Sequence, residues 1–152
     1  MTTFLEELKT RIGEELGVSE WVPMTQEKFD QFAETTGDRD WLHNDPERCA
    51  RESPFGKTIA QGHLLLSHIT QVVETLMPRP KELVYAMNYG YDRVRFIGPV
   101  AVGSRIRGRL VLKGIRPKGD GRYVVEGEVT LEAEGESEPC VATRWLFFVQ
   151  MA

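Results

Sequence analysis

The sequence predicts one α+β domain in which a long, curved antiparallel sheet wraps around a central helix. Two patterns predict this class: a nearly unbroken apolar run from Ile59 to Met77, and a change after Pro80 from helical periodicity to strand alternation. Size is the third observation. A chain of 152 residues, 41% of them hydrophobic, can bury one good core, whereas two domains would each be marginal. We therefore assign residues 1–152 to a single domain.

Charge and cysteine content exclude several classes of protein. A net charge of −4 leaves no basic footprint for nucleic acid. Cys49 and Cys140 lie far apart without metal-ligand spacing, which predicts buried free thiols in a reducing compartment. The N-terminus is acidic and amphipathic, unlike a secretory signal, and no apolar run reaches the ~20 residues that span a bilayer. We expect a cytoplasmic protein that binds neither nucleic acid nor membrane.

Two segments are predicted to form the first and the central helix. Apolar residues from Phe4 to Leu16 recur at helical spacing, so we expect a first helix that Gly17 ends. The run from Ile59 to Met77 has no helix breaker except Gly62, and its first half is apolar almost all round. This pattern is typical of a helix that is buried on most sides. It is the predicted central helix.

Capping signals define two shorter helices between them. Thr25 is a predicted N-cap, with Met24 and Phe29 as a hydrophobic staple, and Gly37 is predicted to end that helix. In the segment NDPERCARE, Asp45 is followed by Pro at the first helical position. A short helix is therefore expected before the SPFG turn.

The second half of the chain is predicted to be an antiparallel sheet. The expected strands are Leu83 to Tyr89, Arg93 to Ile97, Ser104 to Ile115, Arg122 to Glu134, and Cys140 to Gln150. A turn centred between Gly119 and Asp120 gives the third and fourth of them a register that can be tested. It pairs Arg107 with Glu132, Lys113 with Glu126, and Leu110 with Val129. Opposite charges then share one face and apolar residues share the other.

The last predicted strand has large apolar side chains on both faces. Such a strand lies in the middle of a sheet or is covered by a partner subunit. A long buried helix wrapped by a curved antiparallel sheet is the hot-dog arrangement.

The loop before the central helix carries the candidate chemistry. Asp38 follows Gly37, and His43 comes five residues later, in an irregular segment. By itself this spacing is more typical of a structural Asp–His pair. Gly62, however, lies near the helix start, where unpaired N–H groups and the helix dipole favour negative charge and a glycine lets a carbonyl group approach. Together the three residues suit chemistry beside a carbonyl.

The sequence here resembles the MaoC-like hydratase family. The resemblance rests on the motifs GDRDWLH, DPERCA, SPFG and IAQGHLLLS, which follow in order between Gly37 and Ile69. It is greatest for the NodN-like dehydratase branch, which has Trp before the His. NYGYDRVRF and PVAVGSRIRG extend the similarity over nearly the whole chain beyond the first helix.

The resemblance implies an (R)-specific enoyl-CoA hydratase. Such an enzyme adds water to a trans-2-enoyl thioester and gives an (R)-3-hydroxyacyl product, usually as a homodimer. Asp38 and His43 match the family's pair that binds and activates the water, and Gly62 matches the glycine whose backbone N–H receives the thioester oxygen. No metal and no cofactor beyond the CoA of the substrate is expected.

Two positions depart from the family pattern. Asp40 and Trp41 stand where many members have Asn-Pro, so an extra carboxylate lies near the site. Three roles are open for it: an ion pair with Arg39, an ion pair with Arg48, or a contact that makes His43 more basic. Gln61 replaces a His that precedes the Gly in many members, which alters how the helix start is held without removing the backbone donor.

Trp41, Phe55 and Thr70 are tentative substrate-binding residues. Trp41 and Phe55 either line the acyl pocket or anchor the start of a helix. Thr70 lies about two turns beyond Gly62. Its hydroxyl either reaches the site or bonds to its own helix backbone.

Four residues of the predicted sheet complete the tentative set. Asn88 and Tyr89 either reach the site from the sheet or are structural. Arg93 and Arg95 are candidates for the CoA phosphates, because arginine offers several planar donors to phosphate. The alternative for both arginines is a solvated strand face paired to acids.

Two other functions remain open on the same fold. A thioesterase would use an acidic group and the helix start to hydrolyse the thioester, but its carboxylate would more often lie on the helix, and Glu74 is too far along. A non-catalytic module would bind an acyl-CoA or a protein without turnover.

Overall fold

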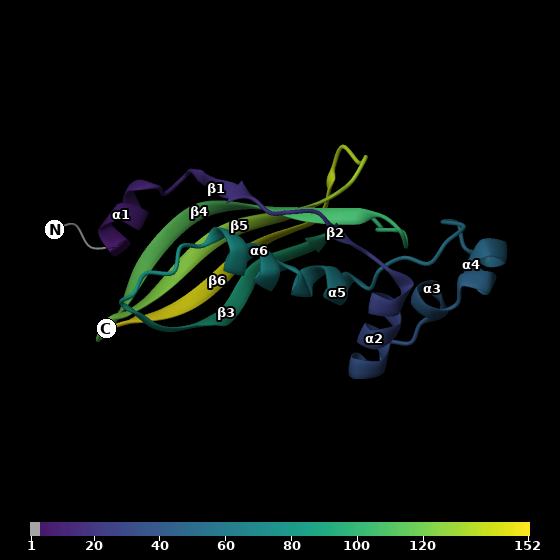
Figure 1. Cartoon of the computed structure of the whole chain (residues 1–152), viewed down its shortest axis with the longest axis horizontal. Helices are drawn as coiled ribbons and strands as arrows, with labels where there is room; N and C mark the ends of the chain where they lie inside the picture. Colours follow the sequence, from purple (N-terminus) through teal and green to yellow (C-terminus); the bar gives the residue numbers. More distant parts are fainter. Residues whose placement is uncertain (1–3) are drawn as a thin grey trace.

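The computed structural model describes residues 4–152, in which helices lie along one face of a curved antiparallel sheet (Figure 1). The helices are α1 (Phe4–Thr10), α2 (Gln26–Thr36), α3 (Trp41–Asn44), α4 (Pro46–Glu52), α5 (Gly62–Ser67) and α6 (Ile69–Leu76). The strands are β1 (Glu15–Val18), β2 (Val22–Pro23), β3 (Leu83–Phe96), β4 (Arg105–Gly119), β5 (Arg122–Ala133) and β6 (Pro139–Met151). Their order is β1-β4-β5-β6-β3, with β2 paired to β4. The predicted α+β class is confirmed.

The core lies between α6 and the inner face of the sheet. Ile69, Val72 and Val73 of α6 are buried against apolar residues of β4, β5 and β6. Helix and sheet lie close together at Gly108 of β4, where a Cβ atom would lie 2.3 Å from a methyl carbon of Val72. A glycine at this position therefore sets how closely the helix packs on the sheet.

The predicted β4–β5 hairpin is correct in most of its register. Arg107 faces Glu132 and Leu110 faces Val129, as expected. The predicted pairing of Lys113 with Glu126 is wrong, because a register shift after Leu112 places Gly114 opposite Glu126. Lys113 instead forms an ion pair with Glu128 at 3.5 Å. A bulge of this kind depends on local twist and has no signal in the alternation of residues.

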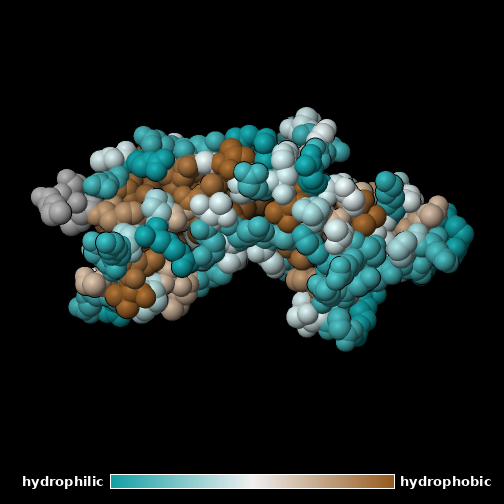
Figure 2. Space-filling view, viewed as in Figure 1, coloured by the Kyte–Doolittle hydropathy of each residue, from teal (hydrophilic) through white to brown (hydrophobic). Residues whose placement is uncertain are grey.

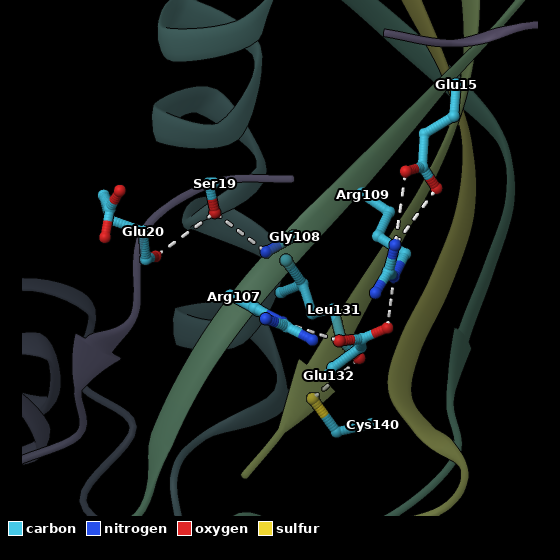
Figure 3. A network of polar contacts seen from close by, with 9 residues as sticks. All are labelled: Glu15, Ser19, Glu20, Arg107, Gly108, Arg109, Leu131, Glu132 and Cys140. Atoms are coloured by element: carbon cyan, nitrogen blue, oxygen red, sulfur yellow. Dashed lines mark hydrogen bonds and ion pairs between the residues drawn. The ribbon is translucent and has the colours of Figure 1, made fainter. Parts of the chain in front are cut away.

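An ion-pair network joins three strands on the outer face of this sheet (Figure 3). The guanidinium of Arg107 donates to Glu132 at 2.8 Å, and Arg109 bonds to both Glu132 and Glu15 of β1. Because both arginines stabilise its charged form, the pKa of the Glu132 carboxyl is lowered. Opposite charges across the strands thus fix the register on the face that the core does not use.

The apolar last strand is explained by its place in the sheet. β6 lies between β5 and β3, and its inward-facing Trp145 is only 1% exposed. The two strands predicted between Leu83 and Ile97 are one strand, β3. Its pairing with β6 has three register shifts, and the strand continues through the two near Gly90, between Asn88 and Gly90 and between Tyr91 and Arg93, rather than breaking at the glycine.

The first predicted helix is too long. α1 ends at Thr10, and Leu16 belongs to strand β1. Gly13 adopts a left-handed conformation (φ 94°) and donates its N–H to the carbonyl of Leu112. Pairing with β4 therefore begins at Gly13, four residues before Gly17, which was expected to end the helix.

The predicted central helix is two shorter helices with an extended lead-in. Residues 59–61 are not helical: Ile59 bridges Ala101, and the N–H of Ala60 donates to Val100. α5 and α6 meet at His68, whose N–H bonds three residues back to Leu65 rather than four. Gly62 therefore stands at the first position of α5, not inside a longer helix.

The predicted caps are confirmed. Thr25 caps α2 through its side chain, Gly37 ends that helix in a left-handed conformation (φ 82°), and Asp45 caps α4. Cys49 and Cys140 are free and buried, and burial raises the pKa of the Cys140 thiol to about 11.

Candidate functional site

His43 lies on α3, and its ring orientation is fixed by the backbone. Its Nδ1 atom lies 2.7 Å from the carbonyl oxygen of Ile59. A carbonyl only accepts hydrogen bonds, so Nδ1 carries the proton and Nε2 of the neutral ring has a free lone pair. The structure therefore presents Nε2 as a base.

The same segment connects His43 to the start of α5. The N–H of Ile59 donates to the carbonyl of Leu42, beside His43, while the Ile59 carbonyl accepts from the ring. Gly62 follows three residues later. The sequence-predicted His43 and Gly62 are thus brought together through the extended residues 59–61.

Gly62 opens α5 without a side-chain cap. Gln61 occupies the N-cap position, but its buried side chain donates to the carbonyl of Phe29 at 2.9 Å instead of capping the helix. The first N–H groups of a helix have no partner within the helix, and the Gln61 side chain does not cap those of α5. A Cβ atom at Gly62 would lie 3.2 Å from the ring of Phe96 on β3. Glycine at this position therefore leaves room for the Phe96 ring.

Asp38 lies in the short connection between α2 and α3. Its side chain is half-buried, and its N–H donates to the hydroxyl of Thr36 at 3.3 Å. Within residues 4–152 its carboxylate makes no hydrogen bond or ion pair, and no hydrogen bond joins it to His43. Both oxygens of Asp38 are therefore available to a ligand or a water molecule.

The role of Asp40 is settled by geometry. Its carboxylate accepts from the N–H of Leu42 at 2.9 Å and caps α3. Arg39 pairs with Glu34 and Arg48 with Glu52, so neither arginine serves Asp40. The two predicted ion pairs of Asp40 are therefore wrong, and the observed role of Asp40 is to start the helix that carries His43.

Sequence reasoning missed a polar network that holds His43 from behind. Gln26 donates to the His43 carbonyl at 2.8 Å and accepts from the hydroxyl of Thr58 at 2.6 Å. Asp30 accepts from both Gln26 and Asn44. Thr58 is fully buried. These residues are far apart in the sequence, and ordinary polar positions on a helix gave no signal that they would meet.

Trp41 and Phe55 do not line the pockets along α6. The guanidinium of Arg48 lies 4.2 Å from the centre of the Trp41 ring, a cation–π contact between α3 and α4. Phe55 is 43% exposed in the turn after α4. Their geometry supports anchoring of this loop more directly than contact with an acyl group.

Thr70 and Asn88 meet at a small pocket, partly open to solvent, between α6 and β3. Trp145 lines the same pocket and donates its indole N–H to the side-chain oxygen of Asn88 at 3.0 Å. Tyr89 is 54% exposed and packs against Phe148 instead. The structure thus brings Thr70 and Asn88 together and separates Tyr89 from them.

Arg93 and Arg95 lie on the sheet face turned away from the core. Arg93 stands directly opposite Arg144 of β6, next to the inward-facing Trp145, and all three arginines line one open hollow. None of the three forms an ion pair in the described part of the chain. The sheet lies between these arginines and α5.

The fold and this arrangement define a class: a hot-dog domain whose candidate site lies at a helix start beside a histidine with a fixed tautomer. A family model described as "MaoC like domain" matches residues 7–136, so the chain belongs to the MaoC-like family. Nodulation protein N of Rhizobium leguminosarum bv. viciae is 44% identical over 146 residues, covering 96% of this chain and 91% of the relative. The 3-hydroxyacyl-thioester dehydratase Z of Mycobacterium tuberculosis (strain ATCC 25618 / H37Rv) is 42% identical, covering 93% and 95%.

Solved structures share the fold. The R-hydratase PhaJ1 of Pseudomonas aeruginosa superimposes with a TM-score of 0.72 at 21% identity, covering 93% of this chain and 83% of that one. The (R)-hydratase of A. caviae gives a TM-score of 0.69 at 18% identity, covering 93% and 96%. Both confirm the predicted hot-dog fold.

Two features are absent from residues 4–152. None of the helices found there is long and apolar enough to span a membrane. The same residues hold no group of three or more His, Cys, Asp or Glu side chains that could bind a metal ion.

Proposed function

We propose that this protein is an (R)-specific hydratase or dehydratase that interconverts trans-2-enoyl-CoA and (R)-3-hydroxyacyl-CoA. The observation that carries the proposal is the hydrogen bond from His43 Nδ1 to the Ile59 carbonyl. It leaves Nε2 as a base and ties that base to the uncapped start of α5. Membership of the MaoC-like family and a relative named as a 3-hydroxyacyl-thioester dehydratase support the same chemistry.

The proposed reaction assigns one task to each group. Asp38 and His43 bind a water molecule, and Nε2 of His43 accepts its proton as the oxygen bonds to C3. The electron pair of the C2–C3 double bond moves toward the thioester, and the Gly62 N–H stabilises the negative oxygen of the enolate. C2 then takes a proton from the Asp38–His43 pair, which restores the starting protonation of the site. General acid–base assistance contributes roughly 10²- to 10⁴-fold, and one oxyanion donor about 3 kcal/mol.

We also propose a cytoplasmic homodimer that uses no metal and no cofactor beyond the CoA of its substrate. The dimer is supported by β3, a 14-residue strand at the edge of the sheet. Val84, Met87 and Tyr89 on this strand are 60%, 50% and 54% exposed. A long edge strand with exposed apolar side chains is a surface that a second chain covers.

The test of the function is a paired assay with the purified protein. Trans-2-enoyl-CoA substrates of increasing chain length are followed by loss of enoyl absorbance, while free thiol is measured in parallel. Loss of absorbance without thiol release is the expected result, and chiral analysis of the product should give the (R) isomer. Release of thiol would identify a thioesterase instead. Silence in both channels at every chain length would leave a non-catalytic binding module.

A further inference from the structure

The outer face of the sheet carries arginines in two different settings. On β4, Arg107 and Arg109 both bond to Glu132, so their positive charges are compensated. On β3 and β6, Arg93 stands directly opposite Arg144. Neither of these two forms an ion pair in the part of the chain that the structure describes. Like charges that face each other across two strands destabilise a sheet unless something neutralises them.

A third arginine without an acidic partner lies next to this pair. Arg95 follows Arg93 by two residues on the same face of β3, about 7 Å along the strand. Its guanidinium donates to the carbonyl of the neighbouring Val94 at 3.0 Å and, within residues 4–152, to no carboxylate. Much of the face drawn in Figure 2 is hydrophilic, with hydrophobic residues gathered near α1. Exposed arginines are therefore ordinary on this molecule, and the lack of acidic partners distinguishes these three.

The three arginines line a hollow of about 580 Å³ that is open to solvent. Ala142 of β6 lies in it, paired with Arg95 of β3 on one side and with Thr130 of β5 on the other. The short side chain of Ala142 leaves space between its longer neighbours. A volume of this size is within the range of small-molecule sites, roughly 300–1,000 Å³. We call this site the arginine hollow.

Two carboxylates also line the arginine hollow, but its net charge is positive. Glu128 of β5 lies opposite Arg144, and its carboxylate pairs with Lys113 at 3.5 Å. Asp92 is exposed and forms no ion pair among residues 4–152. Three guanidinium groups therefore face two carboxylates, one of which is already shared with a lysine. The ligand that suits this hollow is an anion.

We propose that the arginine hollow binds a small ligand that carries a diphosphate group, at a site separate from the candidate active site. Guanidinium groups offer pairs of N–H donors that match the oxygens of a phosphate. One phosphate group lies between Arg93 and Arg144, and the second, joined to it, reaches Arg95. The sheet separates this ligand from Gly62, because Phe96, the residue after Arg95, packs on Gly62 at the inner face. The proposal does not depend on the function proposed above.

The test is a calorimetric titration of sodium pyrophosphate into the purified protein, with NaCl holding the ionic strength at about 0.15 M. We expect one pyrophosphate per chain, bound about 10-fold more tightly than inorganic phosphate, because only the diphosphate contacts all three arginines. A parallel titration with ADP distinguishes the sources of the group. ADP that binds at least as tightly as pyrophosphate assigns the site to a nucleotide, and weaker binding assigns it to the inorganic ion. No saturable binding, or equal affinity for phosphate and pyrophosphate, would overturn the proposal.

Variants of the hollow separate a binding role from a structural one. Arg144→Gln should weaken pyrophosphate binding by about 10-fold or more, because it removes a charged donor. It should also unfold at the same urea concentration as wild type or at a higher one, since it relieves repulsion from Arg93. Arg51→Gln is the matched control, because Arg51 is exposed on α4 and lies outside the hollow. Lower stability of Arg144→Gln with unchanged affinity would overturn the proposal. If this variant does not fold, Ala142→Glu, which places a carboxylate inside the hollow, should abolish binding.

A competition experiment tests whether the site is separate from the candidate active site. Pyrophosphate is titrated in the presence of excess butyryl-CoA, whose saturated acyl group cannot be hydrated, and should bind with unchanged affinity. Displacement would show that these arginines hold the phosphates of CoA itself and would overturn the separate site. Pyrophosphate binding is measured without turnover, so its outcome is distinct from the outcome of the hydration assay.

Discussion

At the scale of single residues, the site depends on how His43 is held. Its ring is oriented by Ile59, its backbone by Gln26, and its helix begins at Asp40. None of these three contacts touches the free Nε2 atom. The surroundings of the histidine therefore act as positioning groups, and the proposed catalytic set adds Asp38 and Gly62 to His43.

Removing either member of the proposed pair should cost activity far more than stability. We expect Asp38→Asn and His43→Gln each to lower kcat by about 10²- to 10⁴-fold, because general acid–base assistance is lost. Both side chains are only half-buried, so the midpoint of urea unfolding should hardly change. The measurement is turnover and chemical denaturation on the same samples. Near-wild-type turnover in either variant would show that the site is assigned to the wrong residues.

Glu132 should make part of the free energy of unfolding depend on pH. Its pKa is lowered in the folded state, chiefly by its hydrogen bond with Arg109, so this stabilisation is present above the unfolded-state pKa and is lost as the pH falls through the lower, folded-state pKa. Glu132→Gln should therefore be less stable than wild type near pH 7, and the difference should shrink steadily as the pH is lowered below about 4.3.

Urea unfolding at a series of pH values measures this difference. Glu138→Gln is the control, since Glu138 is exposed in the turn between β5 and β6 and lies outside the network. A difference between wild type and Glu132→Gln that is constant with pH would contradict the linkage.

At the scale of elements, α6 and the sheet meet through Gly108. The backbone pairing of β4 with β5 does not require a glycine at position 108. The short distance to Val72 does, because any side chain there would collide with it. This contact sets how closely α6 packs on β4. One glycine thereby shapes the core between the helix and the sheet.

Gly108→Ala should destabilise the protein by overpacking. The new methyl group would meet Val72 at 2.3 Å, and the strain of displacing the helix costs about 1–3 kcal/mol. Gly98→Ala is the matched control, because nothing lies within 4 Å of a Cβ atom there. Thermal and urea unfolding of both variants give the comparison. If Gly108→Ala is as stable as Gly98→Ala, the packing at this contact is looser than described.

At the scale of the whole molecule, the exposed β3 edge of the sheet is the proposed dimer interface. The opposite edge is short and is shared by β1 and β2, whereas β3 presents its full length. The pocket that contains Thr70 and Asn88 lies between this strand and α6. A second copy placed on β3 would therefore lie beside this pocket and would also cover apolar surface.

A charged residue on β3 should dissociate the proposed dimer. We expect wild type to sediment as a dimer and Met87→Asp to sediment largely as a monomer, because a buried unpaired carboxylate opposes association. Ile12→Asp is the control, since Ile12 is 44% exposed but lies outside β3. Sedimentation velocity at several concentrations measures the outcome. A wild-type monomer, or a dimer unaffected by Met87→Asp, would rule out this interface.

The sequence by itself determined the class of fold, the helix caps at Thr25, Gly37 and Asp45, and most of the β4–β5 register. Each of these follows from signals within a few residues or from strict alternation. His43 and Gly62 were selected by motif, and the structure adds the segment that links them. Whether they and Asp38 are catalytic stays a prediction.

Only the tertiary structure decided where the first helix ends, that the predicted central helix is two helices of which the first begins at Gly62, and that Asp40 is a cap. It also decided which polar residues hold His43. The physical reason is common to all of them. Each depends on a hydrogen bond or a close contact between segments distant in the chain, and the periodicity of a single segment carries no information about its partner.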